Sequence, residues 1–150
     1  MPIYKPSKKV DELYKGWLIY SPNVSSERDG PCESYHGNGQ LKEKRTYVAG
    51  ERDGPHEGYY ENGQLKDKGT FVAGERDGPY ESYWENGEPR SKGTYVAGEL
   101  DGPIEAYYEN GQLWERGVWS MGEKCGEWLE TTGGGPPTET LTHPPCPPGL

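Results

Sequence analysis

The sequence predicts an all-β fold: an elongated single-layer antiparallel sheet of tandem β-hairpin repeats. The dipeptide Gly-Pro recurs with a period of 24 residues, at Gly30, Gly54, Gly78 and Gly102, and a lone Gly126 continues the series. Each interval contains one Asn-Gly pair flanked by aromatic and β-forming residues, which is typical of a hairpin. With only 30% hydrophobic residues the composition alone would suggest disorder, but 12 Tyr, 5 Trp and 1 Phe indicate an ordered structure.

The period divides the chain of 150 residues into four parts. Four full repeats cover residues 30–125. Residues 1–29 are expected to form an N-terminal cap with a partial repeat, and residues 126–135 a degenerate capping repeat, as at the ends of a solenoid. Residues 136–150 form a Pro-rich tail that we expect to be disordered or in the polyproline II conformation. If the tail is ordered, it docks on its own sheet or on a partner.

The Asn-Gly pairs predict a two-residue type I′ turn at the centre of each hairpin. The segment Ala-Gly-Glu-Arg-Asp-Gly-Pro is expected to close the chain between one hairpin and the next. The predicted turn residues are Asn38, Gly39, Asn62, Gly63, Asn86, Gly87, Asn110 and Gly111. The predicted cross-strand pairs in the second repeat are Tyr60 with Leu65, Tyr59 with Lys66, and Glu57 with Lys68.

This register predicts two unlike faces for the sheet. One face carries one acid–base pair per repeat and is expected to be solvated. These pairs are Glu33 with Lys44, Glu57 with Lys68, Glu81 with Lys92, and Glu105 with Arg116. The opposite face carries two aromatic columns with glycines between them, and stacking of the repeats is expected to bury it. Its residues are Tyr60, Trp84 and Tyr108; Tyr47, Phe71, Tyr95 and Trp119; and Gly69, Gly93 and Gly117.

The repeated string YYENGQLKxKGTYVAGERDGP resembles the MORN-type repeat, and more closely the bacterial variant in YwqK-type antitoxins of toxin–antitoxin modules. The resemblance covers residues 30–125, and Arg45, Pro89 and Trp114 depart from the pattern. It implies an elongated sheet of stacked hairpins that contacts other proteins, with no catalytic residues. Some eukaryotic relatives are proposed to bind phospholipids.

Charge and motifs narrow the function to protein binding. With 16 Lys and Arg against 25 Asp and Glu, the net charge is −9, which disfavours nucleic acid and anionic lipid as partners. The chain contains no nucleophile motif and no phosphate-binding loop, and its carboxylates recur at equivalent positions as structural residues do. We therefore expect a non-enzymatic, cofactor-free module that binds another protein. Two hypotheses remain open: an antitoxin that covers a toxin, and a structural or accessory subunit held by its sheet and C-terminal tail.

Metal binding is the main chemical alternative to a purely structural role for the cysteine and histidine residues of the first two repeats. Cys32 and His56 occupy equivalent positions in successive repeats, and His36 is near them in sequence. The next two repeats have Tyr80 and Ile104 at that position, and a zinc site normally needs three or four ligands. The Glu-Arg-Asp-Gly turns also lack the spacing of a calcium loop. We therefore expect no metal.

The three cysteines, Cys32, Cys125 and Cys146, are odd in number and widely spaced, so we expect reduced thiols. The N-terminal segment lacks the apolar stretch of a signal peptide. Together these features predict a cytoplasmic location.

The predicted partner-binding residues lie near the C-terminal end of the sheet. Trp114 replaces a basic residue of the earlier repeats and is expected on the solvated face, opposite Tyr107. An exposed aromatic pair is typical of a binding hot spot. Trp119 and Trp128 follow on the aromatic face and complete the candidate site. In the alternative interpretation, these rings cap the last hairpin or hold the Pro-rich tail.

Overall fold

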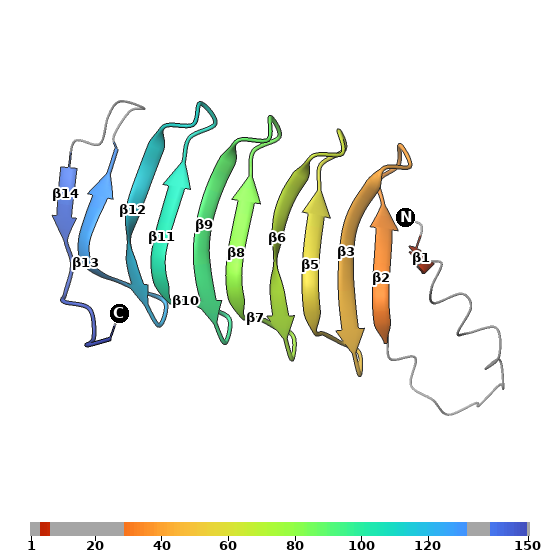
Figure 1. Ribbon diagram of the computed structural model, residues 1–150, viewed down its shortest axis with the longest axis horizontal. Helices are drawn as coiled ribbons and strands as arrows, with labels where there is room; N and C mark the ends of the chain where they lie inside the picture. Colours follow the sequence, from red (N-terminus) through yellow and green to blue (C-terminus); the bar gives the residue numbers. More distant parts are fainter. Residues whose placement is uncertain (1–3, 7–28, 132–138, 150) are drawn as a thin grey trace.

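The computed structural model describes residues 4–6, 29–131 and 139–149. These residues form one 14-stranded antiparallel sheet in which neighbouring strands follow the order of the chain (Figure 1). The predicted all-β fold of tandem hairpins is confirmed. Within the described ranges no helix is long and apolar enough to cross a membrane.

Each repeat contributes a strand of six residues, a strand of eight, and, in the first three repeats, an arm of two. The six-residue strands are β2 (Gly30–Tyr35), β5 (Gly54–Tyr59), β8 (Gly78–Tyr83) and β11 (Gly102–Tyr107). The eight-residue strands are β3 (Leu41–Val48), β6 (Leu65–Val72), β9 (Pro89–Val96) and β12 (Leu113–Ser120). The arms are β4 (Glu51–Arg52), β7 (Glu75–Arg76) and β10 (Glu99–Leu100). The sheet is completed by β1 (Tyr4–Pro6) at one end and by β13 (Glu123–Glu130) and β14 (Glu139–Thr142) at the other.

The Asn-Gly turns are three-residue loops. In the second repeat the Gly63 amide donates to the Tyr60 carbonyl at 2.9 Å, and the Tyr60 amide donates to the Gln64 carbonyl at 2.9 Å. Gly63 has a φ of 86°, whereas Asn62 is not among the residues of positive φ. This is the pattern of a type I turn followed by a left-handed glycine in a bulge. The predicted type I′ geometry is therefore wrong, although the predicted residues do form the turn.

Asparagine is needed in these loops for its side chain. The Asn62 Oδ1 atom accepts a hydrogen bond from the Gln64 amide, and its Nδ2 atom donates to the Glu85 carbonyl of the next turn, each at 2.9 Å. The first and third turns repeat this arrangement through Asn38 and Asn86. The asparagines thus join neighbouring repeats along one end of the sheet.

The two-residue type I′ turn lies at the other end of each repeat, in the Ala-Gly pair. Ala73 and Gly74 have φ values of 47° and 86°, and Val72 pairs with Glu75 across them. The other repeats have positive φ at Ala49, Gly50, Ala97, Gly98, Met121 and Gly122. Both central residues of a type I′ turn need this conformation. As predicted, this segment connects one hairpin to the next.

The predicted register holds over most of each hairpin because two shifts cancel. The three-residue loop places Tyr59 opposite Leu65, so the predicted pairs nearest the turn, Tyr60–Leu65 and Tyr59–Lys66, are wrong. A β-bulge at Lys66 then shifts the register back, and Glu57 faces Lys68 as predicted. The same bulge recurs in each of the four repeats.

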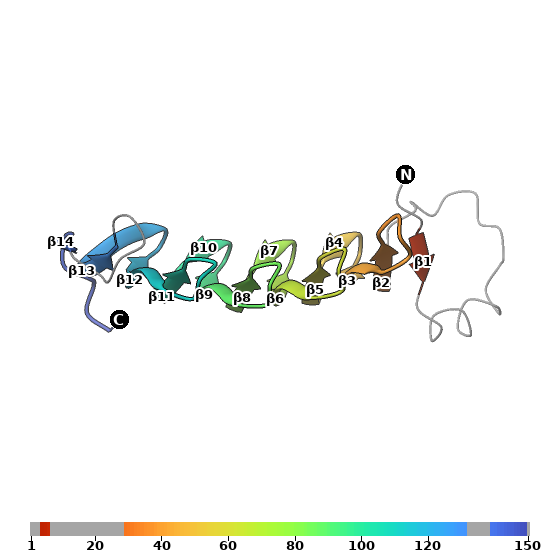
Figure 2. The same ribbon diagram turned by 90° about the horizontal axis from the view of Figure 1, so that it is seen from above.

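The core lies on the aromatic face, beneath the short arms, which all lie on one side of the sheet (Figure 2). The Arg52 guanidinium of β4 lies 5.2 Å from the centre of the Phe71 ring, and both Phe71 and Tyr47 are buried. A Cβ atom on Gly69 would lie 3.3 Å from the Tyr80 ring. The prediction that aromatic rings cover the glycines of this face is confirmed at Gly69.

The C-terminal tail folds back onto the sheet. Strand β14 pairs with β13, and the Gly126 amide donates to the Pro144 carbonyl at 2.8 Å while the His143 amide donates to the Gly126 carbonyl at 2.9 Å. The expectation of a disordered or polyproline II tail is therefore wrong for residues 139–142. Of the two ways in which the tail could be ordered, the structure shows docking on its own sheet.

A disulfide between Cys125 and Cys146 fixes the tail to β13. The prediction of reduced thiols is wrong for these two residues, because the hairpin of β13 and the tail brings their Cα atoms to 4.9 Å. Cys32 is buried, and its Sγ atom lies 3.7 Å from the Gly30 carbonyl oxygen.

Candidate protein-interaction face

The face opposite the aromatic core, which we call the ladder face, carries a Tyr, a Glu and a basic residue in each repeat. The Tyr59 hydroxyl donates to Glu57 Oε2 at 2.7 Å, because residues two apart in a strand share a face. Lys44 Nζ lies 4.0 Å from Glu57 Oε2, and Lys68 Nζ lies 3.1 Å from Glu81 Oε2. These ion pairs join the first repeat to the second and the second to the third, in addition to the predicted facing of Glu57 and Lys68.

These contacts shift the protonation of the ladder groups. Hydrogen bonds from Tyr83 and then from Lys68 lower the pKa of Glu81, and the same Glu81 contact raises the pKa of Lys68. Burial, followed by the hydrogen bond to Glu57, raises the pKa of Tyr59 to about 12. At neutral pH Tyr59 therefore remains a hydrogen-bond donor and Glu81 remains charged. Such a surface presents organised hydrogen-bonding and charged groups to a partner.

Shallow grooves cross the ladder face between hairpins. One groove has a volume of about 250 Å³, and the equivalent groove two repeats further on has a volume of about 400 Å³. Both are lined by two prolines, a threonine, two glutamates and a lysine at equivalent positions. In the first groove these are Pro31, Pro55, Thr46, Glu33, Glu57 and Lys44. The grooves arise because β5 pairs with β3 only at Glu43 and Lys44, while β4 occupies the other end of β3.

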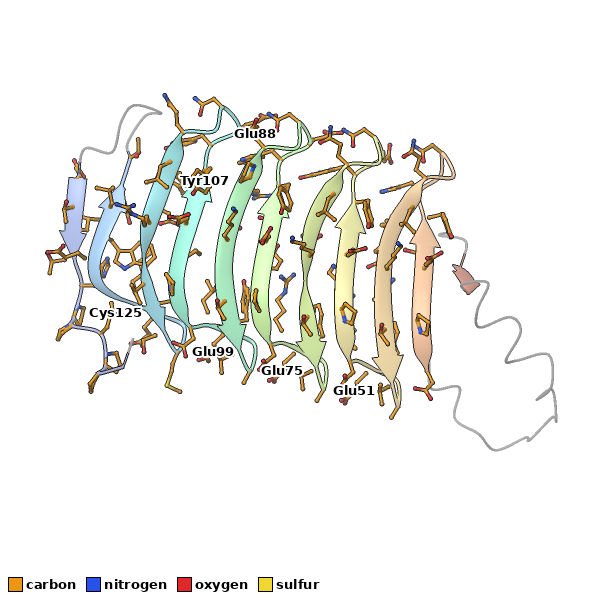
Figure 3. The ribbon with its side chains drawn as sticks, viewed as in Figure 1. Glu51, Glu75, Glu88, Glu99, Tyr107 and Cys125 are labelled. Carbon is orange, nitrogen blue, oxygen red and sulfur yellow. A yellow bond between two sulfur atoms is a disulfide. The ribbon has the colours of Figure 1, made fainter. Side chains whose placement is uncertain are left out.

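An exposed row of valines and glutamates follows the type I′ tips. Val48, Val72 and Val96 are 54%, 51% and 50% exposed. Each valine faces a glutamate of the adjoining arm across the tip. These glutamates are Glu51, Glu75 and Glu99, which lie in a line along one end of the sheet (Figure 3). We call these six residues the tip row.

The predicted pairing of Trp114 with Tyr107 is wrong. The bulge in the fourth repeat places Leu113 opposite Tyr107, and Trp114 packs against Tyr108 with 6.2 Å between ring centres. Trp114 is 47% exposed, so it is available for contact, but beside Tyr108 rather than on the ladder face. Tyr107 lies on the ladder face, where its hydroxyl donates to Glu105 at 2.6 Å. Partner binding by Trp114 and Tyr107 stays a prediction.

Trp119 and Trp128 lie together on the aromatic face, as predicted, with 5.7 Å between their ring centres. Trp128 is completely buried, and its Nε1 atom lies 3.1 Å from the Cys125 carbonyl. Its ring also contacts His143 of the tail at 6.0 Å. Trp128 is therefore not part of a binding surface in this structure. It holds the tail, as the alternative interpretation proposed.

The histidines of the hypothetical metal cluster contact protein groups. His56 Nε2 lies 3.2 Å from Asp67 Oδ2, and Arg76 lies 3.9 Å from the same oxygen. His36 Nε2 lies 2.9 Å from the Tyr59 carbonyl. The hydrogen bond from His56 is the main cause that lowers the pKa of Asp67, and the charge of Arg76 adds to it. In the described part of the chain, no three His, Cys, Asp or Glu residues converge as a metal site would require.

The sequence interpretation missed the half-buried polar position that Asp67 represents. Its equivalents each find a different partner: Glu43 binds Arg45, Ser91 binds Ser82 at 2.7 Å, and Glu115 binds Lys124 at 3.0 Å. The signal in the sequence was that all four repeats carry a polar residue at an inward-facing position. A buried polar group needs a partner, and each repeat supplies its own.

Comparison with known proteins identifies the repeats. The family model described as MORN repeat variant matches residues 28–49, 52–73, 76–97 and 100–120. No curated protein is significantly similar to the chain.

Among solved structures, the crystal structure of TarM is 10% identical with a TM-score of 0.37, and the match covers 76% of this chain and 22% of TarM. A mutant of S. aureus TarM in complex with Fondaparinux, alpha-GlcNAc-glycerol and UDP is 10% identical with a TM-score of 0.39, covering 81% of this chain and 24% of that one. The chain thus spans about a quarter of these proteins. This likeness is too weak to support an argument.

Proposed function

Since the chain belongs to the MORN repeat variant family, whose repeats are generally protein- or membrane-binding modules, we propose that it is a non-catalytic module that binds another protein. The observation that carries the proposal is the ladder face, where the same hydrogen-bonded Tyr–Glu pair and the same exposed proline recur in successive repeats. The valines of the tip row add exposed apolar surface that does not contribute to the core. Exposed apolar groups next to organised polar groups are typical of an interface.

The partner that we propose first is a basic protein, and specifically a toxin that the module covers as an antitoxin. The net charge of −9 favours a basic partner over an anionic membrane, and the resemblance of the repeats to YwqK-type antitoxins supports the toxin. The alternative is a subunit held in a larger complex by its sheet and its tail. It has less support, because the Cys125–Cys146 disulfide and the β13–β14 pairing hold the tail on its own sheet.

The cytoplasmic location expected from the sequence is untested. The Cys125–Cys146 disulfide weighs against it, because the cytosol keeps most thiols reduced. Alkylation of free thiols immediately after cell lysis would show whether these two cysteines are oxidised in the native source.

The proposed binding through the ladder face can be tested by placing a bulky side chain on that face. Thr70 is exposed on this face and pairs with Pro55, so Thr70→Arg places a bulky side chain beside a proline. Gln64→Arg adds the same side chain at an exposed Asn-Gly turn and serves as the control. Tagged wild type and both variants are purified from the native source and the co-purifying proteins are quantified.

We expect a stoichiometric partner that is lost with Thr70→Arg and retained with Gln64→Arg, at equal melting temperatures. A partner retained by both variants would place binding elsewhere, and the absence of any stoichiometric partner would contradict the proposed function. A small basic toxin as the partner supports the antitoxin hypothesis, and a large assembly supports the subunit hypothesis.

A further inference from the structure

The tip row combines exposed apolar and acidic groups in strict alternation. Val72 and Glu75 face each other across a tip, which brings their side chains to the same face of the sheet. A Cβ atom on Gly98 would contact the Glu75 side chain at 3.8 Å, so Glu75 reaches from its own arm to the next tip. Glu51, Glu75 and Glu99 are all exposed and aligned (Figure 3).

The glutamates of the tip row form no ion pair with any other described residue. On the ladder face, Lys44 and Lys68 form ion pairs with Glu57 and Glu81. Among the residues that the structure describes, no basic side chain lies within 4.0 Å of a tip-row glutamate. The tip row is therefore the place where an apolar surface and uncompensated negative charge coincide, and it favours a ligand that is apolar and basic.

The spacing of the row restricts the conformation of that ligand. Successive tips are hydrogen-bonded through the arms: the Gly74 amide donates to the Arg52 carbonyl and the Gly98 amide to the Arg76 carbonyl, each at 2.8 Å. Each repeat therefore advances by two strands at the tips, or roughly 9.6 Å. A polyproline II helix returns to the same side every three residues, after about 9.3 Å.

Other peptide conformations fit this spacing less well. Residues on one side of a β-strand recur after about 6.7 Å, so their spacing does not match the row's period of roughly 9.6 Å. An α-helix returns close to the same side after seven residues and about 10.5 Å, but drifts by about 20° each time. Over the two intervals of the row the helix falls about 1.8 Å out of step and turns by about 40°, whereas the polyproline II helix stays within about 1 Å.

We propose that the tip row binds a polyproline II segment of a partner protein, with an apolar residue at every third position and Lys or Arg between. The apolar residues lie on Val48, Val72 and Val96, and the long basic side chains reach the neighbouring glutamates. This inference rests on the proposed function, because it specifies the part of the protein partner that is recognised. The chain's own Pro-rich tail is a poor occupant, since residues 136–150 contain no Lys or Arg and the disulfide holds Cys146 on β13, at the C-terminal end of the sheet.

The test uses labelled synthetic peptides and the full chain, with binding followed by fluorescence anisotropy. The probe is (Pro-Pro-Lys)4, which in the polyproline II conformation spans about 37 Å, enough for the whole row. Matched peptides are (Gly-Ser-Lys)4, which keeps the charge without the conformation, and an amphipathic Leu- and Lys-rich helix of equal charge. The protein variants are Val72→Ser and Glu75→Lys, with Glu85→Lys as the control because Glu85 is exposed at the opposite, Asn-Gly end.

We expect (Pro-Pro-Lys)4 to bind at least ~10-fold more tightly than either matched peptide. Glu75→Lys should weaken binding by ~10-fold or more and Val72→Ser by ~3-fold or more, while Glu85→Lys changes it by less than ~2-fold. Equal binding of (Gly-Ser-Lys)4, tighter binding of the helix, or equal effects of the two charge reversals would overturn the proposal. Thermal melts confirm that each variant is folded.

The two proposals can fail separately. If (Pro-Pro-Lys)4 does not bind but a native partner is still lost with Thr70→Arg, the tip-row inference is wrong and the proposed function stands. If the peptide binds but no stoichiometric native partner is found, the proposed function fails and the row is left only as a peptide-binding surface.

Discussion

The indole of Trp128 occupies the space that a side chain on Gly117 would need. A Cβ atom built on Gly117 would overlap the Cδ2 and Cε2 atoms of the ring, and Trp128 is completely buried. The ring is held from the other side by His143 and by its own Nε1 hydrogen bonds to backbone carbonyls. Gly117 and Trp128 therefore form one packing unit at the C-terminal end of the sheet.

Gly117→Ala should destabilise this end of the protein. The added methyl group forces Trp128 out of its site, and overpacking of this kind costs about 1–3 kcal/mol. Gly93→Ala is the matched control, because its Cβ atom would lie 3.4 Å from Leu100 and 3.5 Å from Ile104. Urea unfolding followed by tryptophan fluorescence should show a large decrease in the free energy of unfolding for Gly117→Ala and little change for Gly93→Ala. Equal decreases for the two variants would contradict the packing described.

Reduction of the Cys125–Cys146 disulfide should release the tail. The bond closes a loop with a sequence separation of 21, for which the stabilisation is roughly 3 kcal/mol. We expect faster hydrogen exchange at the Gly126 and His143 amides after reduction, because these amides bond between the tail and β13. Cys146→Ser should show the same exchange with and without reductant, and an effect of reductant on this variant would point to another cause.

Asp67 should contribute to stability at neutral pH and not in acid. Its pKa is lowered in the folded protein, so its contribution is complete above its usual value of about 3.9 and is lost as pH falls through the folded pKa. Asp67→Asn should cost ~1–2 kcal/mol at pH 7, and the difference from wild type should shrink below about pH 4. Urea unfolding at pH 7 and pH 3 measures this. Exposed Glu85→Gln is the control, and a pH-independent effect of Asp67→Asn would contradict the ionic origin.

The loss of stability on replacing a turn asparagine should depend on which repeat contains it. Asn86→Ala removes a hydrogen bond to the Glu88 amide and another to the Glu109 carbonyl of the next turn. Among the described residues, Asn110→Ala removes only hydrogen bonds within its own loop, because the Asn110 Nδ2 atom donates to Gln112. We expect Asn86→Ala to cost ~1 kcal/mol more than Asn110→Ala in urea unfolding. A common cost for both would mean that the bond between turns contributes nothing.

The fold and the two faces follow from the sequence because the repeat supplies the same information four times. Period-two alternation fixes which residues share a face, so Glu57 and Lys68 were placed opposite each other and Phe71 on the buried side. The two Gly-containing turns were both located. Their conformations were not, because Asn-Gly suits a type I′ turn and also a type I turn followed by a left-handed glycine.

The candidate site was less predictable than the fold. A bulge cannot be recognised from alternation alone, and the bulge in the fourth repeat is what moves Trp114 from Tyr107 to Tyr108. The disulfide was missed for another reason. Composition marks residues 136–150 as irregular, and only the hydrogen bonds of the folded tail bring Cys146 to Cys125.

The docked tail also determines which strand forms the C-terminal edge of the sheet. An open sheet ends in strands with free amides and carbonyls, and another copy of the chain can add to such an edge. At the C-terminal end, β13 is eight residues long but is covered by β14, which is only four residues long and leads into Pro144 and Pro145. Prolines have no amide hydrogen to offer an incoming strand. Release of the tail on reduction would expose β13, a longer edge without prolines, and we therefore expect reduction to favour association of two copies through this edge.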